Sequence, residues 1–260
     1  LIPISHPEYC RAGEAMRHHR RLENMLSVGK GLIVNSAATR DELMAYAAAR
    51  DITVPPCAVA LLAPAKLPEP YRGRPMERPY FVVLGTIEPR KNHLLLLHLW
   101  RQLVAELGDA APELVVIGQR GWECEQVVDL LDRCAVLQGH VTELPRCDDR
   151  ELATWLAHAQ ALLFPSFIDG FGMPLVEALM LGVPVIASDL PVFREIAGDI
   201  PCYLDPLDGP GWRRAALEFM SPESVSRQAQ IRRMAGYSPP TWLQHFEVVK
   251  DLLRKIDADA

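Results

Sequence analysis

The sequence lacks the short motifs that mark several common enzyme classes. It has no G-x-x-x-x-G-K-[ST] phosphate loop and no G-x-S-x-G nucleophile turn. The stretch "GFGMPL" at residues 170–175 lacks the third glycine of a dinucleotide-binding fingerprint. These absences argue against a P-loop NTPase, an α/β-hydrolase and a standard dinucleotide-dependent enzyme.

Cysteine is sparse and scattered. The six cysteines form no C-x-x-C pair, and disulfide frameworks belong mostly to shorter secreted chains. We therefore interpret them as reduced thiols of a cytoplasmic protein. A zinc site would have to combine Cys134, His140 and Cys147, whose spacing fits no common ligand pattern, so no metal is expected.

Positive charge and long apolar runs are also scarce. Lys and Arg number 27 against 33 Asp and Glu, a net charge of −6, whereas nucleic-acid surfaces carry clustered positive charge. Nucleic acid is therefore not an expected partner. The longest apolar run, near "LLLLHLW", is followed by Arg101 and is too short to span a bilayer. Because the chain starts at Leu1 within what resembles a folded element, we expect it to be a fragment.

From residue 80 to about residue 220, short apolar runs alternate with helical periodicity. The expected strands include "YFVVLG", "ELVVIG", "AVLQG", "ALLFPS" and "PVIAS", and helices are expected between them. Most of these runs are apolar throughout, which is typical of a parallel sheet covered on both faces. The pattern predicts a doubly wound α/β domain, whose ligands lie beyond the carboxyl ends of the strands.

The flanking segments have a different organisation. Residues 1–62 predict a smaller piece of similar type, with a helix at about 14–27, the strand "GLIVNS", a helix capped by Ser36 and the strand "CAVALL". Residues 63–79 hold five prolines and are interpreted as a linker. Residues 221–260 are expected to form a turn and a final amphipathic helix.

The loop after the first strand of the large domain carries two cations. In "LGTIEPRKN", the strand ends at Gly85 and a helix begins near Asn92, so Arg90 and Lys91 lie at the carboxyl end of the strand. A planar guanidinium and an ammonium together suit a diphosphate. The alternative is an ordinary solvated pair of charges.

A second strand-to-helix junction lies in "FPSFIDGFGMPLVEALM". Gly170 and Gly172 permit close approach of the backbone to a ligand, and Pro174 suits a first helical turn. Free N–H groups around Phe171, Gly172 and Met173 are expected to face an anion or hydroxyl oxygens, because the partial positive charge at the start of a helix attracts such groups.

Two carboxylates flank this junction. Asp169 precedes the glycines and Glu177 lies one turn into the helix. Carboxylates accept hydrogen bonds from sugar hydroxyls, so the expected ligand combines phosphate with hydroxyl groups. The alternative is that Asp169 belongs to an ordinary turn and that Glu177 merely complements the helix dipole.

Taken together, "GTIEPRKN", "VVIGQRGW" and "PSFIDGFGMPLVEALMLGVPVIASDLPVFREIAGD" resemble glycosyltransferase family 4, particularly bacterial mannosyl- and related transferases of polysaccharide assembly. The resemblance implies a GT-B fold, in which two Rossmann-like domains face a cleft and the carboxyl-terminal domain holds a nucleotide sugar without a metal or other cofactor. Residues 80–220 are then the donor domain, and residues 1–62 the last part of a partial acceptor-side domain.

The resemblance also implies roles for individual residues. Arg90 and Lys91, beside Gly85, would neutralise the donor diphosphate, and Glu177 matches the second acid of the family's E-x7-E motif, which binds the ribose. Asp169 replaces the first Glu, expected at the donor sugar, and is one methylene shorter. The remaining implied contacts are the backbone of Gly170, Phe171, Gly172 and Met173 for sugar and phosphate, and Gly139, His140 and Val141 for the nucleobase.

By the same resemblance, the function is a retaining transfer of mannose or a similar sugar from a nucleotide-diphosphate sugar. A GDP-sugar such as GDP-mannose is favoured, and the acceptor is a glycan or lipid-linked molecule of cell-surface polysaccharide or lipopolysaccharide synthesis. The competing hypothesis is a donor-binding module without activity, because of Asp169 and because a family His-Asp pair expected before Leu1 is missing. An epimerase or phosphorylase of the same fold is a third hypothesis.

The stretch "RAGEAMRHHRRLENML" combines arginines and apolar residues at helical spacing. We hypothesise that its basic part, Arg17 to Arg21, contacts an anionic membrane or a lipid-diphosphate acceptor, placing the protein at the inner face of the membrane. The alternative is a solvated helix face.

Overall fold

The computed structural model describes residues 1–221 and 223–258. They form two bodies: residues 1–64, 169–172 and the described residues from 238 onward make the first, and residues 65–168 and 173–237 the second. The boundary near residue 64 lies close to the predicted start of the linker. The predicted carboxyl-terminal segment is divided, since residues up to 237 group with the second body and the final helix with the first.

The first body contains a two-stranded parallel sheet, in which Leu32 pairs with Cys57 and Val34 with Val59. Ser36 caps the helix after the first strand, because its Oγ accepts a hydrogen bond from the Thr39 N–H at 3.0 Å. The elements are α1 (Ile2–Ser5), a 3₁₀ turn (Pro7–Tyr9), α2 (Glu14–Val28), β1 (Leu32–Val34), α3 (Ala37–Ala48), β2 (Cys57–Val59) and α11 (Trp242–Ala258).

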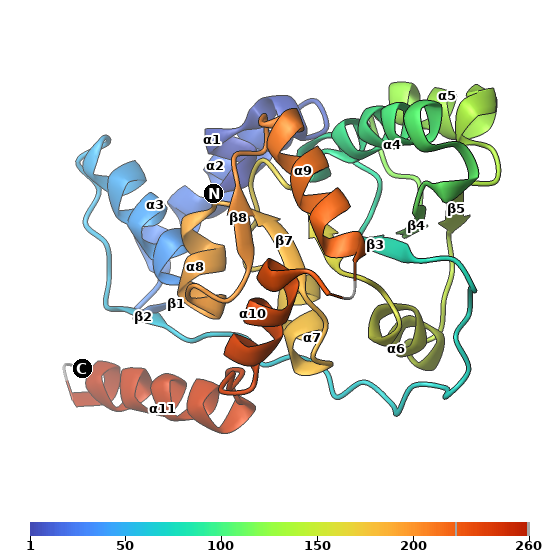
Figure 1. Ribbon diagram of the computed structural model, residues 1–260. Helices are drawn as coiled ribbons and strands as arrows, with labels where there is room; N and C mark the ends of the chain where they lie inside the picture. The colour runs from blue at the N-terminus through green and yellow to red at the C-terminus, as the bar shows by residue number, and fades with distance from the viewer. Residues whose placement is uncertain (222, 259–260) are drawn as a thin grey trace. The chain divides into compact units, whose positions relative to one another are not determined.

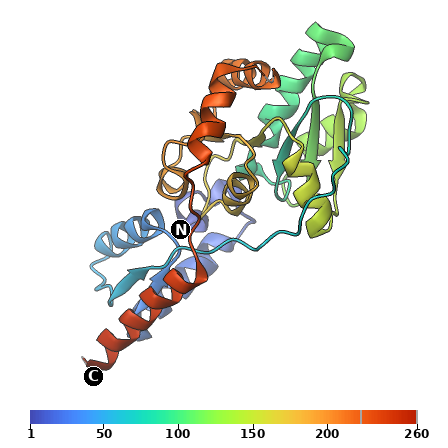
Figure 2. The ribbon, with the colours of Figure 1, turned by 60° about the horizontal axis from the view of Figure 1, so that its bottom comes forward.

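The final helix packs against this small sheet, although it is distant in sequence. It contacts β2, and Figure 2 shows it, in red, beside the two strands. His245 Nδ1 lies 3.0 Å from the carbonyl oxygen of Leu61. Gly31 gives α11 room, since a Cβ there would lie 2.5 Å from Ile256 Cδ1. The core between α2, α3 and β1 consists of Leu22, Leu26, Leu32, Leu43 and Tyr46.

The second body is built on a six-stranded parallel sheet of order β5-β4-β3-β6-β7-β8 (Figure 1). Its strands are β3 (Tyr80–Leu84), β4 (Glu113–Ile117), β5 (Val141–Leu144), β6 (Leu162–Phe164), β7 (Val185–Ser188) and β8 (Cys202–Leu204). Its α-helices are α4 (His93–Leu107), α5 (Glu125–Arg133), α6 (Asp149–Ala157), α7 (Met173–Met180), α8 (Pro191–Ala197), α9 (Gly209–Met220) and α10 (Val225–Met234). Further 3₁₀ turns span Pro89–Lys91, Gly108–Ala110 and Ala135–Leu137.

The strand order confirms the predicted doubly wound fold. The chain runs outward from β3 to β5 and then returns to place β6 on the other side of β3. Alternate residues of each central strand face opposite layers. Phe81, Val83, Leu114 and Val116 pack with α4, α5 and α9, whereas Tyr80 and Phe164 contact Trp155 of α6 and Phe193 of α8.

One predicted strand is wrong. The run "AVLQG" forms the 3₁₀ turn Ala135–Leu137, and the strand follows it as β5. β5 lies at the edge of the sheet and pairs only with β4, so its half-exposed residues need not be apolar throughout. The apolar run instead buries Leu137 in the core as a turn.

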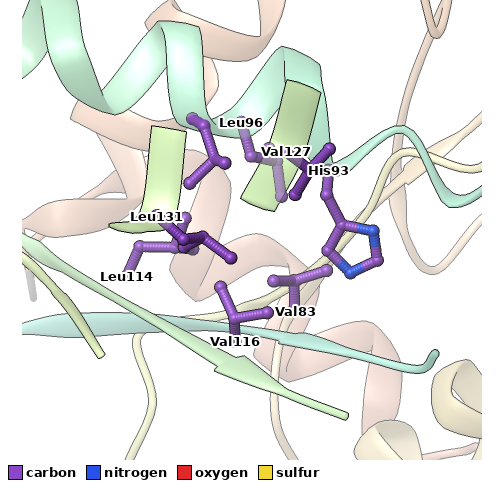
Figure 3. A pocket seen from close by; sticks show the side chains of 8 residues that line it. Val83, His93, Leu96, Leu114, Val116, Val127 and Leu131 are labelled. Atoms are coloured by element: carbon purple, nitrogen blue, oxygen red, sulfur yellow. The ribbon is translucent and has the colours of Figure 1, made fainter. Parts of the chain in front are cut away.

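His93, at the start of α4, is a buried histidine among apolar side chains (Figure 3). It is 3% exposed, and within the described part of the chain neither ring nitrogen has a hydrogen-bond partner. Burial, with a smaller effect of Lys91, lowers its pKa from 6.5 to about 4. The neutral form is therefore favoured in the folded state.

Replacing His93 by leucine is expected to reduce the acid sensitivity of the fold. Because the folded pKa lies below that of the unfolded chain, the unfolded chain binds an extra proton as the pH falls from 6.5 to about 4. Over that window His93 lowers the free energy of unfolding by up to about 3 kcal/mol. Urea unfolding at pH 7 and pH 5 should show a smaller loss for His93→Leu than for the parent.

The exposed His98 on the same helix supplies the control. His98→Leu should leave the difference between pH 7 and pH 5 unchanged. An equal acid loss in the parent and in His93→Leu would show that His93 does not contribute.

Candidate functional site

The carboxyl ends of β3 and β6 meet at the middle of the sheet, where the order of the strands reverses. Val82 pairs with Leu162, so the loops that follow the two strands are neighbours. The Phe167 N–H donates a 2.8 Å hydrogen bond to the Arg90 carbonyl, which joins the two loops. Ligands of doubly wound sheets bind beyond the strands at this reversal point.

Arg90 is anchored by both loops. Its Nη2 lies 2.6 Å from Glu88 Oε1, and its Nη1 donates to the Ile168 carbonyl at 3.4 Å. A guanidinium is planar, so holding two of its nitrogens fixes the direction of the whole group. The Arg90 side chain retains 22% exposure.

Lys91 is held differently and is only 7% exposed. Its Nζ lies 4.8 Å from the centroid of the Phe164 ring, a cation–π contact with the last residue of β6. Gly85 lies beside it, since a Cβ at residue 85 would be in ordinary van der Waals contact with Lys91 Cε, at 3.6 Å, and its φ of +139° favours glycine. The three predicted residues Gly85, Arg90 and Lys91 are thus brought together at this edge.

Glu177 lies on α7, which begins at Met173 with Pro174 in its first turn. Among the residues that the structure describes, its carboxylate makes no hydrogen bond or ion pair. Burial, and to a lesser degree the charge of Asp149, raises its pKa. A partly buried carboxylate without partners costs stability and suits a hydroxyl-bearing ligand.

Glu177→Gln is therefore expected to stabilise the protein while weakening the binding of a sugar-containing ligand. A carboxyl whose folded pKa is raised loses stability as the pH increases above 4.5, the value of an exposed glutamate. The variant should have a higher Tm than the parent at pH 7 in scanning calorimetry. Glu218→Gln, on the exposed face of α9, is the matched control and should not change the Tm. A lower Tm for Glu177→Gln would contradict this account.

Asp169, Gly170, Phe171 and Gly172 group with the first body, in contrast to the residues on either side of them. The Gly170 N–H donates to Asp169 Oδ1 at 3.0 Å. Gly172 has a φ of +103°, a conformation that favours glycine. Phe171 is buried.

Gly139, His140 and Val141, which were predicted to hold the nucleobase, lie at the amino-terminal ends of the strands, away from Arg90 and Lys91. Val141 is the first residue of β5, and its two predecessors precede the strand. The His140 carbonyl accepts from the Leu114 N–H at 2.9 Å, and Arg78 Nη2 donates to the Gly139 carbonyl at 2.8 Å. These contacts lie at the amino ends of parallel strands, whereas ligands bind at the carboxyl ends.

A loop that was not predicted as part of the site lies at the carboxyl end of β5. Pro145, Arg146 and Cys147 follow the strand, and the Gly118 N–H donates to the Leu144 carbonyl at 3.0 Å. This loop therefore lies at the same edge as Gly85 and the end of β4. The mixture of β-branched, polar and apolar residues in "VTEL" is compatible with a half-exposed edge strand but contains no period-2 alternation that would have identified it.

Across residues 1–221 and 223–258, no group of three or more His, Cys, Asp and Glu side chains has a metal-binding arrangement. The same residues include no helix that is both long and apolar enough to cross a membrane.

Comparison with known proteins assigns the chain to a family. The family model of glycosyl transferases group 1 matches residues 70–200. The chain belongs to this family. The matched residues include the loop after β3, which carries Arg90, the loop after β6, which contacts Arg90, and the start of α7.

Individual proteins that are similar to the chain in sequence support this family assignment. Over 163 residues the chain is 32% identical to O-antigen chain mannosyltransferase B of Escherichia coli, covering 63% of this chain and 42% of that protein. Over 125 residues it is 37% identical to the Escherichia coli serotype-specific mannosyltransferase WbdA, covering 48% of this chain and 15% of that protein. The chain thus spans less than half of the length of either relative.

A solved structure shows the same fold. A mutant of Staphylococcus aureus TarM, in complex with fondaparinux, α-GlcNAc-glycerol and UDP, matches with a TM-score of 0.69 at 14% identity. The match covers 93% of this chain and 46% of that one. The α/β architecture is that of GT-B glycosyltransferases.

Proposed function

We propose that this chain carries the nucleotide-sugar-binding part of a glycosyltransferase that makes cell-surface polysaccharide. The observation that carries the proposal is the pair of cations, Arg90 and Lys91, fixed where β3 and β6 diverge. A diphosphate bound there would accept a charge-assisted hydrogen bond from each. The mannosyltransferase relatives favour mannose as the sugar.

The two cations would also accelerate the reaction. As the bond between the anomeric carbon and the diphosphate breaks, negative charge grows on the leaving oxygen, and Arg90 and Lys91 would stabilise it. We propose that the acceptor hydroxyl attacks from the same face, so that the anomeric configuration is retained. Neither step requires a metal ion, and we expect EDTA to leave donor binding unchanged.

The other parts of the donor are assigned to neighbouring loops. Glu177 would accept hydrogen bonds from the ribose hydroxyls. The loop at residues 145–147, rather than residues 139–141, would contact the base, because it follows β5 at the carboxyl ends of the strands. GDP is the favoured nucleotide, although the TarM complex contains UDP.

The helix α2 is proposed to contact the membrane that holds a lipid-linked acceptor. Leu22 and Leu26 are buried, while Met16 and Met25 are 60% and 50% exposed, and Arg20 and Arg21 share the exposed side. Arginines beside exposed apolar groups favour binding to anionic lipids. The double variant Arg20→Glu/Arg21→Glu should reduce sedimentation with vesicles of anionic lipid. Unchanged sedimentation would contradict membrane contact.

Calorimetric titration with GDP, UDP and ADP tests the donor site. We expect selective binding of one nucleotide, with GDP favoured, and weaker binding by Glu177→Ala. Absence of binding to all three would contradict the proposal for this chain.

A further inference from the structure

Glu88 is a buried carboxylate beside the proposed diphosphate site. It is 4% exposed and forms an ion pair with Arg90, with Nη2 and Oε1 separated by 2.6 Å. Taking a carboxylate out of water is unfavourable, and pairing with a cation often does no more than offset that cost. A buried ion pair is therefore weak evidence for a role in stability, and its position becomes the informative observation.

The backbone around Glu88 is fixed by the loops of two strands. The preceding residue, Ile87, accepts from the Gly121 N–H and donates to the Gln119 carbonyl, both at 2.9 Å. The following residue is Pro89, which favours the extended conformation observed for Glu88, with φ −145° and ψ 159°. The Lys91 N–H donates to the Glu88 carbonyl at 3.1 Å and closes the 3₁₀ turn. Glu88 thus offers a rigid acceptor at one side of Arg90.

The second anchor of Arg90 comes from another loop. The Ile168 carbonyl accepts from Nη1 at 3.4 Å, a long hydrogen bond, so the shorter contact with Glu88 is the stronger constraint. Lys91 has a contact of its own, because its Nζ lies over the Phe164 ring.

We propose that Glu88 is a positioning residue for donor binding, whose carboxylate directs the Arg90 guanidinium toward the diphosphate. The inference rests on the proposed function, and Glu88 itself does not contact the ligand. Without the carboxylate, Arg90 keeps its charge but loses its fixed orientation, so bidentate contacts with phosphate become less frequent. The loss of affinity caused by a Glu88 substitution should therefore be seen with a nucleoside diphosphate and not with the monophosphate.

The test compares a nucleoside diphosphate with its monophosphate, using calorimetry with GDP and GMP and, in parallel, UDP and UMP. The measured quantity is the ratio of the monophosphate Kd to the diphosphate Kd. Glu88→Gln should lower this ratio by about fivefold to tenfold and leave the monophosphate Kd unchanged. Arg90→Gln should lower it at least as much. The double variant should match Arg90→Gln alone, because Glu88 acts only through Arg90.

A second buried carboxylate provides the control. Glu113 is 3% exposed and pairs with Arg78, but it lies at the amino-terminal edge of the sheet. Glu113→Gln should leave the ratio unchanged. If Glu88 has only a structural role, Glu88→Gln should weaken the binding of the diphosphate and the monophosphate equally. Its effect on affinity should then add to that of Arg90→Gln in the double variant.

The outcomes separate the inference from the proposed function. If Arg90→Gln lowers the ratio and Glu88→Gln does not, the positioning role is wrong and the donor site stands. If the parent binds no nucleotide, or Arg90→Gln has no effect, the proposed site is wrong and the role of Glu88 falls with it. Should Glu88→Gln fail to fold, Glu88→Asp keeps the charge but is shorter, and should lower the ratio. Failure of both to fold would assign Glu88 to folding and overturn the inference.

Discussion

Lys91→Met is expected to weaken nucleoside diphosphate binding by about ten- to a hundredfold, or about 1.5–3 kcal/mol. The reason is that Lys91 supplies a nearly buried ammonium beside Gly85 at the carboxyl end of β3. A charge-assisted hydrogen bond is stronger there than in water because less solvent screens it. Methionine is an unbranched side chain only one atom shorter than lysine, so the variant removes the ammonium with little change in volume.

Titration calorimetry with GDP and UDP measures this effect. Lys66→Met removes an exposed lysine of the same body and should leave the affinity unchanged. Its circular dichroism and that of Lys91→Met should match the parent. Equal affinities of Lys91→Met and the parent would remove Lys91 from the site.

Gly118→Ala is expected to destabilise the second body by about 3 kcal/mol or more. Gly118 directly follows β4 beside the end of β3, and a Cβ there would lie 2.1 Å from the Gly85 carbonyl oxygen. That atom belongs to the backbone, so relief requires the two strand ends to separate. The same movement would disturb the loop that holds Lys91.

Chemical denaturation measures this loss of stability. Gly236→Ala is the matched control, since a Cβ there meets no atom within 4 Å, and its stability should be within about 0.5 kcal/mol of the parent. A similarly small change for Gly118→Ala would show that the strand ends are not packed as described.

The fold was predictable where burial leaves a continuous apolar run. β3 and β4 are buried almost throughout, and the runs "YFVVLG" and "ELVVIG" identify both. The edge strand β5 was not predictable from a continuous apolar run, because it has a neighbouring strand on one side and its residues are half-exposed. The apolar turn before it, Ala135–Leu137, gave the stronger signal and displaced the predicted strand by several residues.

That displacement explains why His140 was expected at the carboxyl end of a strand. A strand ending at Gly139 would put His140 at the carboxyl-terminal edge, whereas the observed strand starts at Val141 and ends at Leu144. Arg90 and Lys91 were placed correctly because β3 ends where the sequence predicts. The Glu88–Arg90 pair was not predictable, since residues two apart meet only when the turn at Pro89 brings them together.

The most direct test of the donor site is amide NMR of the isotope-labelled chain during titration with GDP and UDP. We predict that the largest shift changes occur at Gly85, Arg90, Lys91 and Glu177, with changes at residues 145–147 from the base. Gly139, His140 and Val141 should be nearly unaffected. Changes concentrated at those three residues, or no changes at either edge of the sheet, would contradict a donor site at the β3–β6 reversal point.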